Sequence, residues 1–171
     1  MKPIHVVYMS ISGHVRSFID RLTSYADEQA RQFPTRCPRI VSEELIDEDD
    51  VRELDYDFVM FIPTYVSLSP NDHRTYYENS TIPLRELLNC GNNVHRCRGL
   101  VGNGDRFFGP AFCLTSRQYA KLFHIPLLAT YESRGTSKDI ATIYQKLVQQ
   151  YPAKTARNRF PRQLKASLST N

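Results

Sequence analysis

The segment from Ser10 to Val15 carries the groups of this 171-residue chain that are best suited to bind a phosphate. It joins an apolar run, Ile4 to Met9, to a helix-period run that begins at Val15, so a strand ends and a helix begins there. At the carboxyl edge of a parallel sheet, such a junction presents free backbone N–H groups and the positive end of the helix dipole. Ser10 and Ser12 add hydroxyl donors, and the glycine beside them permits a positive φ. An ordinary helix start capped by a serine explains the same residues equally well.

Two further polar segments follow predicted strands. Phe58 to Ile62 is a continuous apolar run, typical of a central strand buried on both faces, and it leads into Pro63 to Ser69. A short strand, Gly99 to Val101, opens into the glycine-rich segment Gly102 to Gly109. Because the loops after successive parallel strands emerge at one edge of a sheet, we expect the three polar segments to converge.

The three segments differ in chemistry in a way that suits a single ligand. The first offers donors to a phosphate, the second contains the aromatic ring of Tyr65, and the third combines polar groups with Phe107 and Phe108. A ligand with a phosphate at one end and a flat, hydrogen-bonding ring at the other would contact all three. Flavin mononucleotide (FMN) fits that description. The three aromatic side chains are, alternatively, ordinary packing residues.

The elements that must position these segments follow from hydrophobic periodicity. Helices are predicted from Val15 to Ala26, near Pro83 to Leu88, from Phe112 to Phe123 and from Ile140 to Tyr151, and further strands are predicted at Arg39 to Ser42 and Leu127 to Tyr131. A long polar loop is expected from Thr64 to Thr81. Strands that alternate with helices in this order predict an α/β domain with a parallel sheet.

Composition favours one globular domain. The chain is long enough for a core, and 41% hydrophobic residues are typical of a globular protein. No apolar run approaches the roughly 18 to 20 residues that span a bilayer, and the amino terminus lacks the regions of a signal peptide. We therefore expect a cytoplasmic protein with no membrane partner.

Cysteines and histidines do not indicate a metal site. The four cysteines are dispersed without a C-x-x-C pair, so we expect reduced thiols; they are Cys37, Cys90, Cys97 and Cys113. Cys113 has no evident His/Asp constellation and is predicted to be a buried thiol on an apolar helix face. His5 alternates within a strand and is predicted to be structural, and the histidines do not have ligand spacing.

The net charge of +4 is unevenly distributed. Residues 152–171 contain five basic residues and no acid, so they carry +5 and the rest of the chain carries 17 − 18 = −1. This distribution argues against nucleic acid as a partner; a flexible, solvated tail is favoured over one that touches RNA or an acidic partner. An acidic stretch from Glu43 to Asp57 is expected to be a solvated connection, with docking to a basic partner as the alternative.

Several motifs, in order, resemble one known family. They are Y-M-S-I-S-G-H-V-R-S-F-I, F-I-P-T-Y, R-G-L-V-G-N-G-D-R-F-F-G, A-F-C-L-T-S-R-Q-Y-A-K-L-F-H-I-P-L-L and Y-E-S-R-G-T-S-K-D-I. Each motif alone is weak, but their order and spacing over residues 4–150 are specific. The chain resembles the NrdI flavodoxins, which partner class Ib ribonucleotide reductase.

The resemblance implies a flavodoxin-like fold, a doubly wound parallel five-stranded sheet of order 2-1-3-4-5 with helices on both faces. It implies an FMN-binding domain over residues 1–151, followed by the basic tail 152–171. The implied role is to supply an oxidant, superoxide made from oxygen by reduced flavin, for assembly of the dimanganese-tyrosyl radical cofactor. The implied partners are the small subunit of class Ib ribonucleotide reductase and an electron-donating reductase.

The resemblance also assigns cofactor-binding residues, with no catalytic residue and no metal ligand. The phosphate loop comprises Ser10, Ile11, Ser12, Gly13, His14 and Val15. The segment beside the flavin ring comprises Pro63, Thr64, Tyr65 and Val66, and the cover of its pyrimidine side comprises Gly102, Asn103, Asp105, Phe107, Phe108 and Gly109.

This chain departs from the family pattern at several of these positions. His14, Asp105 and Phe107 stand where the family usually has Asn, and Val66 to Pro70 replaces a stretch that is often glycine-rich. The departures motivate an alternative, a flavodoxin-fold binding module without redox activity. A generic electron-carrier flavodoxin is a further alternative, disfavoured because such carriers are usually strongly acidic.

Overall fold

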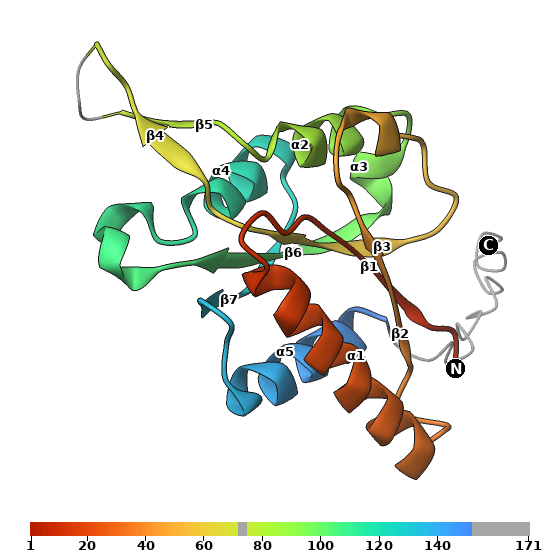
Figure 1. The fold of residues 1–171 in the computed structure, drawn as a ribbon. Helices are drawn as coiled ribbons and strands as arrows, with labels where there is room; N and C mark the ends of the chain where they lie inside the picture. The colour runs from red at the N-terminus through yellow and green to blue at the C-terminus, as the bar shows by residue number, and fades with distance from the viewer. Residues whose placement is uncertain (72–74, 152–171) are drawn as a thin grey trace, which may run out of the picture.

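A five-stranded parallel sheet forms the centre of the computed structural model, which describes residues 1–71 and 75–151 (Figure 1). Its strands are β1 (Ile4–Tyr8), β2 (Ile40–Glu44), β3 (Phe58–Ile62), β6 (Cys97–Gly104) and β7 (Leu127–Glu132). They lie in the order β2-β1-β3-β6-β7, and every neighbouring pair is parallel. The predicted α/β class and the strand order 2-1-3-4-5 are therefore confirmed.

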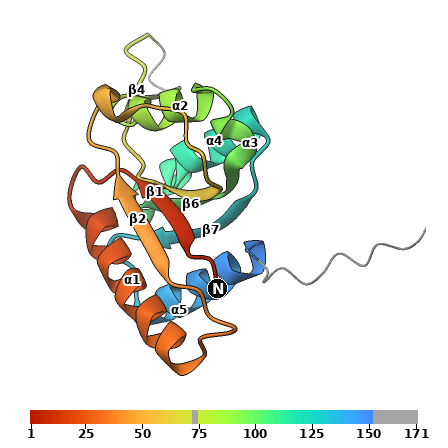
Figure 2. The same ribbon diagram turned by 90° about the vertical axis from the view of Figure 1, so that its right-hand side faces the viewer.

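Helices cover both faces of this sheet, as Figure 2 shows edge-on. One face carries α1 (His14–Gln32) and α5 (Ser137–Gln150), and the other carries α2 (Ile82–Asn89), α3 (Asn93–Arg96) and α4 (Leu114–Phe123). Alternate residues of β1 enter different cores: Val6 packs with α1 and α5, whereas Val7 packs with α2 and α4. All five residues of β3 are buried, as expected for a central strand covered on both sides.

The segment expected to be a long polar loop, Thr64 to Thr81, is more ordered than predicted. It contains an antiparallel hairpin of β4 (Val66–Leu68) and β5 (Tyr76–Glu78), which extends from the main sheet (Figure 1). Three-residue strands are too short to show an alternating pattern, which is why sequence periodicity missed them.

The helix predicted to begin at Phe112 begins two residues later, at Leu114. Cys113 between them has a φ of 52°, in the left-handed region, which a helix cannot contain. Phe112 therefore belongs to the preceding turn, η2 (Arg106–Ala111) and its end, and not to the apolar face of α4. Cys113 itself is buried, as predicted, although it precedes the helix.

The acidic stretch is not simply a solvated connection. Glu43 lies in β2 and accepts a hydrogen bond from the Tyr56 hydroxyl at 2.7 Å, and it pairs with Arg52 at 2.6 Å. The Tyr56 ring also stacks on His5, with the ring centroids 4.2 Å apart. Part of the stretch therefore fastens the edge strand β2 to the segment before β3, and the structural role predicted for His5 is confirmed.

Other predictions concern the ends and the thiols of the chain. All four cysteines are free. Within the ranges that the structure describes, no helix is both long enough and apolar enough to span a bilayer. The basic tail, residues 152–171, lies outside the described residues, so a domain boundary at residue 151 stays a prediction.

Close packing of α4 on the end of β6 generates a first prediction. A Cβ atom at Gly104 would lie 2.7 Å from the backbone nitrogen of Cys113, which cannot move aside easily. We expect Gly104→Ala to lower the free energy of unfolding by about 1 to 3 kcal/mol, measured by urea denaturation.

Gly99→Ala in the same strand is the matched control. Its Cβ would meet the Leu128 side chain at 2.5 Å, and this partly buried side chain can rotate away. The control variant should be the more stable of the two; an equal or larger loss at Gly99 would contradict the packing argument.

Candidate functional site

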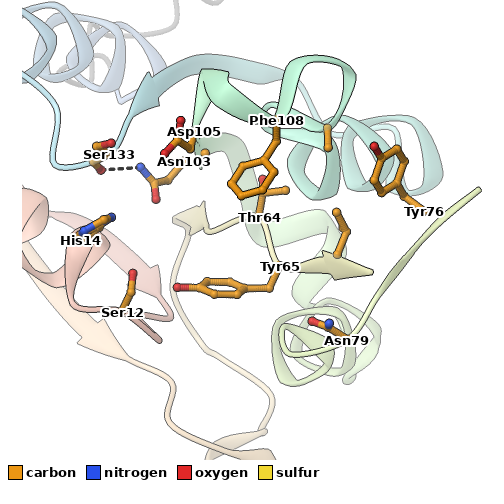
Figure 3. A pocket seen from close by; sticks show the side chains of 13 residues that line it. Ser12, His14, Thr64, Tyr65, Tyr76, Asn79, Asn103, Asp105, Phe108 and Ser133 are labelled. Atoms are coloured by element: carbon orange, nitrogen blue, oxygen red, sulfur yellow. Dashed lines mark hydrogen bonds between the residues drawn. The ribbon is translucent and has the colours of Figure 1, made fainter. Parts of the chain in front are cut away.

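A cavity of about 370 Å³ opens at the carboxyl edge of the sheet, where the predicted segments meet (Figure 3). Its size is within the range of small-molecule sites. From the predicted residues, the cavity brings together Ser12, His14, Thr64, Tyr65, Val66, Asn103, Asp105 and Phe108. The expected convergence of the three segments is therefore a feature of the structure.

The loop before α1 presents unused backbone donors. Gly13 has a φ of 81°, and no atom would lie within 4 Å of a Cβ there, so this position is strained for other residues but not crowded. Among the hydrogen bonds of the described residues, none uses the amides of Ile11 to Val15. These amides and the positive end of α1 form a concave group of donors suited to an anion.

Ser10 also holds the start of α1, and its predicted role as a hydroxyl donor stays a prediction. Its Oγ accepts a hydrogen bond from the Arg16 amide at 3.0 Å, in the first turn of α1. The sequence left open whether this segment is a helix start held by a serine or a loop with free amides, and the structure contains both features.

Two aromatic rings point into the cavity from different loops. Figure 3 shows the Tyr65 ring, from the segment after β3, and the Phe108 ring, from the turn after β6. Phe107 does not line the cavity; it is 88% exposed and meets Phe108 edge-on, with the ring centroids 5.7 Å apart. The cavity wall is therefore suited to a flat ring, with one further phenyl ring left outside it.

The polar residues that line the cavity include a threonine, an asparagine and an aspartate. Thr64 Oγ1 is buried, and no described residue gives it a hydrogen-bond partner. Asn103 donates from Nδ2 to the Ser133 carbonyl oxygen at 2.7 Å, which orients its amide (Figure 3). The Asp105 carboxylate accepts from the Phe107 amide at 2.8 Å and contributes negative charge to the rim. The Asn103 amide and the Asp105 carboxylate therefore supply polar groups to the cavity, whereas the Thr64 hydroxyl is covered by protein atoms.

The remaining predicted residues lie around the cavity and do not line it. Val15, Pro63 and Gly102 are buried beneath the loops, whereas Ile11 is exposed. A Cβ at Gly102 would collide with the Ser116 hydroxyl of α4. Gly109 has a φ of 50° and reverses the chain within η2.

Sequence reasoning missed several cavity residues, which are Tyr76, Asn79, Ala111 and Ser133. Tyr76 and Asn79 arrive through the unpredicted hairpin. Ser133 follows β7, so the rule that brought three segments to this edge applies to it as well and would have found it.

A buried carboxylate fixes the base of the hairpin beside the cavity. The Glu78 carboxyl is 8% exposed and accepts from the Thr81 and Tyr119 hydroxyls, and it pairs with Arg85 at 3.3 Å. Burial and this carboxylate raise the pKa of Tyr119, so its hydroxyl stays a donor. The backbone N–H of the next residue, Asn79, donates to the Tyr65 carbonyl oxygen at 3.3 Å, and this hydrogen bond links the buried Glu78 carboxylate to the cavity wall.

A thiol lies directly behind the cavity. A Cβ at Gly104 would be 3.3 Å from Cys113 Sγ, and Gly104 lines the cavity. Burial raises the pKa of Cys113 to about 12. The side chain is therefore a neutral thiol at physiological pH.

The buried Glu78 carboxylate at the base of the hairpin generates a second prediction. Glu78→Gln removes the charge that pairs with Arg85, and it replaces one carboxylate oxygen by an NH₂ group that cannot accept a hydrogen bond. We therefore expect a loss of about 2 kcal/mol in the free energy of unfolding. Hydrogen exchange at the amides of Val66 to Leu68 should accelerate as the hairpin loosens.

Glu86→Gln is the matched control, because Glu86 pairs with the same arginine at 3.8 Å but is 47% exposed. We expect it to change stability by less than about 0.5 kcal/mol. Equal effects of the two substitutions would refute the role assigned to Glu78.

Comparison with known proteins gives a consistent result. The model of the family described as NrdI Flavodoxin like matches residues 6–145. An NrdI-like protein of Streptococcus pneumoniae is 36% identical over 141 residues, which are 82% of this chain and 89% of the relative. Protein NrdI of Erwinia tasmaniensis is 28% identical over 153 residues, covering 88% and 96% of the two chains.

A solved structure of a short-chain flavodoxin, associated with a non-canonical PDU bacterial microcompartment, shares the fold. It superposes with a TM-score of 0.52 at 17% identity and covers 88% of this chain and 96% of its own. The sheet order, the site at its carboxyl edge and the family match over most of the chain lead to one conclusion: the chain belongs to the NrdI flavodoxin-like family.

Proposed function

We propose that the cavity binds FMN, with the phosphate on the amides of Ile11 to Val15. The unused amides of that loop carry the proposal, because two residues of the loop, Ser12 and His14, line a cavity that also presents aromatic and polar groups. Ser12 adds a hydroxyl, and His14 lines the cavity at the start of α1. Family membership supports the same ligand.

The other end of the cavity suits the flavin ring. Tyr65 and Phe108 offer flat apolar surface, and the amide of Asn103 offers polar edges. When bound and reduced, FMN supplies electrons that oxygen can accept to give superoxide. An ionised Asp105 at the rim opposes additional negative charge in the cavity, so it would tune the ease of reduction.

We further propose that the protein provides this oxidant to the small subunit of class Ib ribonucleotide reductase, for assembly of its dimanganese-tyrosyl radical cofactor. A separate electron-donating reductase would reduce it, and both steps belong in the cytoplasm. Family membership and the name of the Erwinia relative support this role.

The surface around the cavity opening is suited to a protein partner. Exposed apolar side chains occur on the two segments that border it, namely Phe107 at 88%, Phe108 at 61%, Tyr77 at 50% and Leu68 at 45% exposure. Aromatic side chains are enriched at docking surfaces, and three of these four exposed side chains are aromatic. The same segments would then cover the ligand and contact the partner.

The phosphate loop generates a third prediction. Gly13→Val forces a β-branched residue to a positive φ and disturbs the amides, so it should weaken FMN binding more than His14→Asn does. Titration of the apo protein with FMN, followed by flavin fluorescence, measures both. Riboflavin, which lacks the phosphate, is the control ligand and should bind the two variants similarly.

The reverse order of the two variants would mean that the His14 side chain holds the phosphate. A loss of riboflavin binding in Gly13→Val would instead indicate general damage to the site.

The fourth prediction tests the function. Reconstituted and reduced protein should consume oxygen and raise the tyrosyl radical yield in a manganese-loaded class Ib small subunit, measured by electron paramagnetic resonance. Free reduced FMN at the same concentration is the control, since it produces the oxidant without a docking surface.

Three outcomes separate the candidate functions. Radical formation above the free-flavin control supports the proposal. Oxygen consumption without that increase would favour a generic electron-carrier flavodoxin. A colourless protein that FMN cannot reconstitute would favour the binding module without redox activity.

A further inference from the structure

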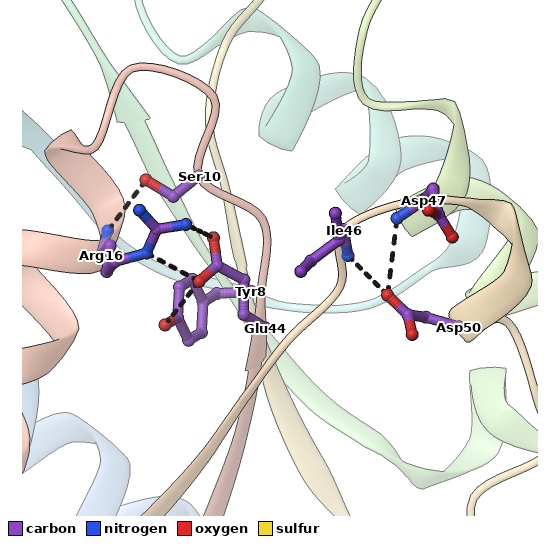
Figure 4. Close-up of polar contacts among 7 residues, drawn as sticks. All are labelled: Tyr8, Ser10, Arg16, Glu44, Ile46, Asp47 and Asp50. Atoms are coloured by element: carbon purple, nitrogen blue, oxygen red, sulfur yellow. Dashed lines mark hydrogen bonds and ion pairs between the residues drawn. The ribbon is translucent and has the colours of Figure 1, made fainter.

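An ion pair lies directly beneath the loop that precedes α1 (Figure 4). Arg16 donates to Glu44 through two nitrogens, Nε at 2.8 Å and Nη2 at 2.7 Å. The Tyr8 hydroxyl donates to the same carboxylate at 3.2 Å. The Glu44 side chain is 17% exposed and the Arg16 side chain is 53% exposed, so only the carboxylate of this bidentate pair is shielded from water.

The pair connects three elements that meet at the loop. Tyr8 and Glu44 are register partners at the ends of β1 and β2, and Arg16 is in the first turn of α1. The backbone amide of Arg16 is held by Ser10, on the opposite side of the loop (Figure 4). One arginine therefore fastens the loop at both ends, through its amide and through its guanidinium group.

The pair also determines which charges face the cavity. Glu44 engages the guanidinium group of Arg16, and Arg16 does not line the cavity. The donors that remain in the loop are backbone amides, the Ser12 hydroxyl and the His14 imidazole ring, and the contribution of the amides to anion binding depends on their orientation.

We propose that Arg16 and Glu44 are positioning residues for the phosphate loop. Their pairing holds the first turn of α1 against the ends of β1 and β2, and this keeps the amides of Ile11 to Val15 aimed at one point. The inference rests on the proposed binding of FMN. It assigns the effect of Arg16 to geometry and not to attraction between its charge and the phosphate.

Two neutral substitutions separate geometry from charge. Arg16→Gln removes a positive charge and Glu44→Gln removes a negative charge, but each breaks the bidentate pair. If the pair positions the loop, both variants should bind FMN more weakly, by about five- to tenfold, while their affinity for riboflavin is unchanged. The double variant should resemble the single variants, because one interaction is lost in all three.

Arg98→Gln is the matched control. Arg98 pairs with Asp57 at 2.6 Å and half of its side chain is exposed, but neither residue lines the cavity. This variant should bind FMN and riboflavin like the wild type, and urea denaturation of all variants verifies that they are folded at the titration temperature.

Opposite effects of the two substitutions, weaker binding in Arg16→Gln and tighter binding in Glu44→Gln, would overturn the inference in favour of a charge effect. Unchanged FMN affinity in both would overturn it as well, and so would equal losses for FMN and riboflavin. If the wild type does not bind FMN, both the proposed function and this inference fail. If the wild type binds FMN, the variants test the positioning role separately from the proposed function.

Discussion

Burial of β3 on both faces is the constraint on which the rest of the structure depends. Both neighbours of this strand pair with it in parallel, and the connections between parallel strands cross over through the covering helices, so the polar segments that follow the strands emerge at one edge. The cavity forms at that edge because three such segments, together with Ser133 after β7, meet there. The chemistry of the site is therefore a consequence of how the apolar core is layered.

The sequence allowed much of this arrangement to be predicted, because the signals were local. The apolar run Phe58 to Ile62 and the periodic helices gave the layers, and Gly13 marked a positive φ that the structure contains. The hairpin was missed because its strands have three residues each and pair across a segment of the chain that shows no pattern. The contacts of Glu78 and of Glu44 were also missed, since they join residues far apart in sequence and leave no local signal.

Charge is arranged around the cavity in a consistent way. Arg16, in the first turn of α1, is paired with Glu44, and Arg106 next to Asp105 contacts both Glu132, at 3.5 Å, and the Phe112 ring, at 4.5 Å. Asp105 caps the turn that carries Phe107 and Phe108. Side chains with full charges thus mainly hold loops in place, while neutral donors and aromatic rings line most of the interior. A site of this kind discriminates by shape and donor direction more than by net attraction.

The thiol behind the cavity has a consequence for the proposed function. Oxidation of cysteine begins from the thiolate, and a pKa raised to about 12 leaves about one Cys113 side chain in 10⁵ ionised at pH 7. A Cβ atom at the cavity residue Gly104 would lie 3.3 Å from this sulfur. A reactive oxygen species released in the cavity would therefore meet a sulfur that is almost entirely in its unreactive thiol form.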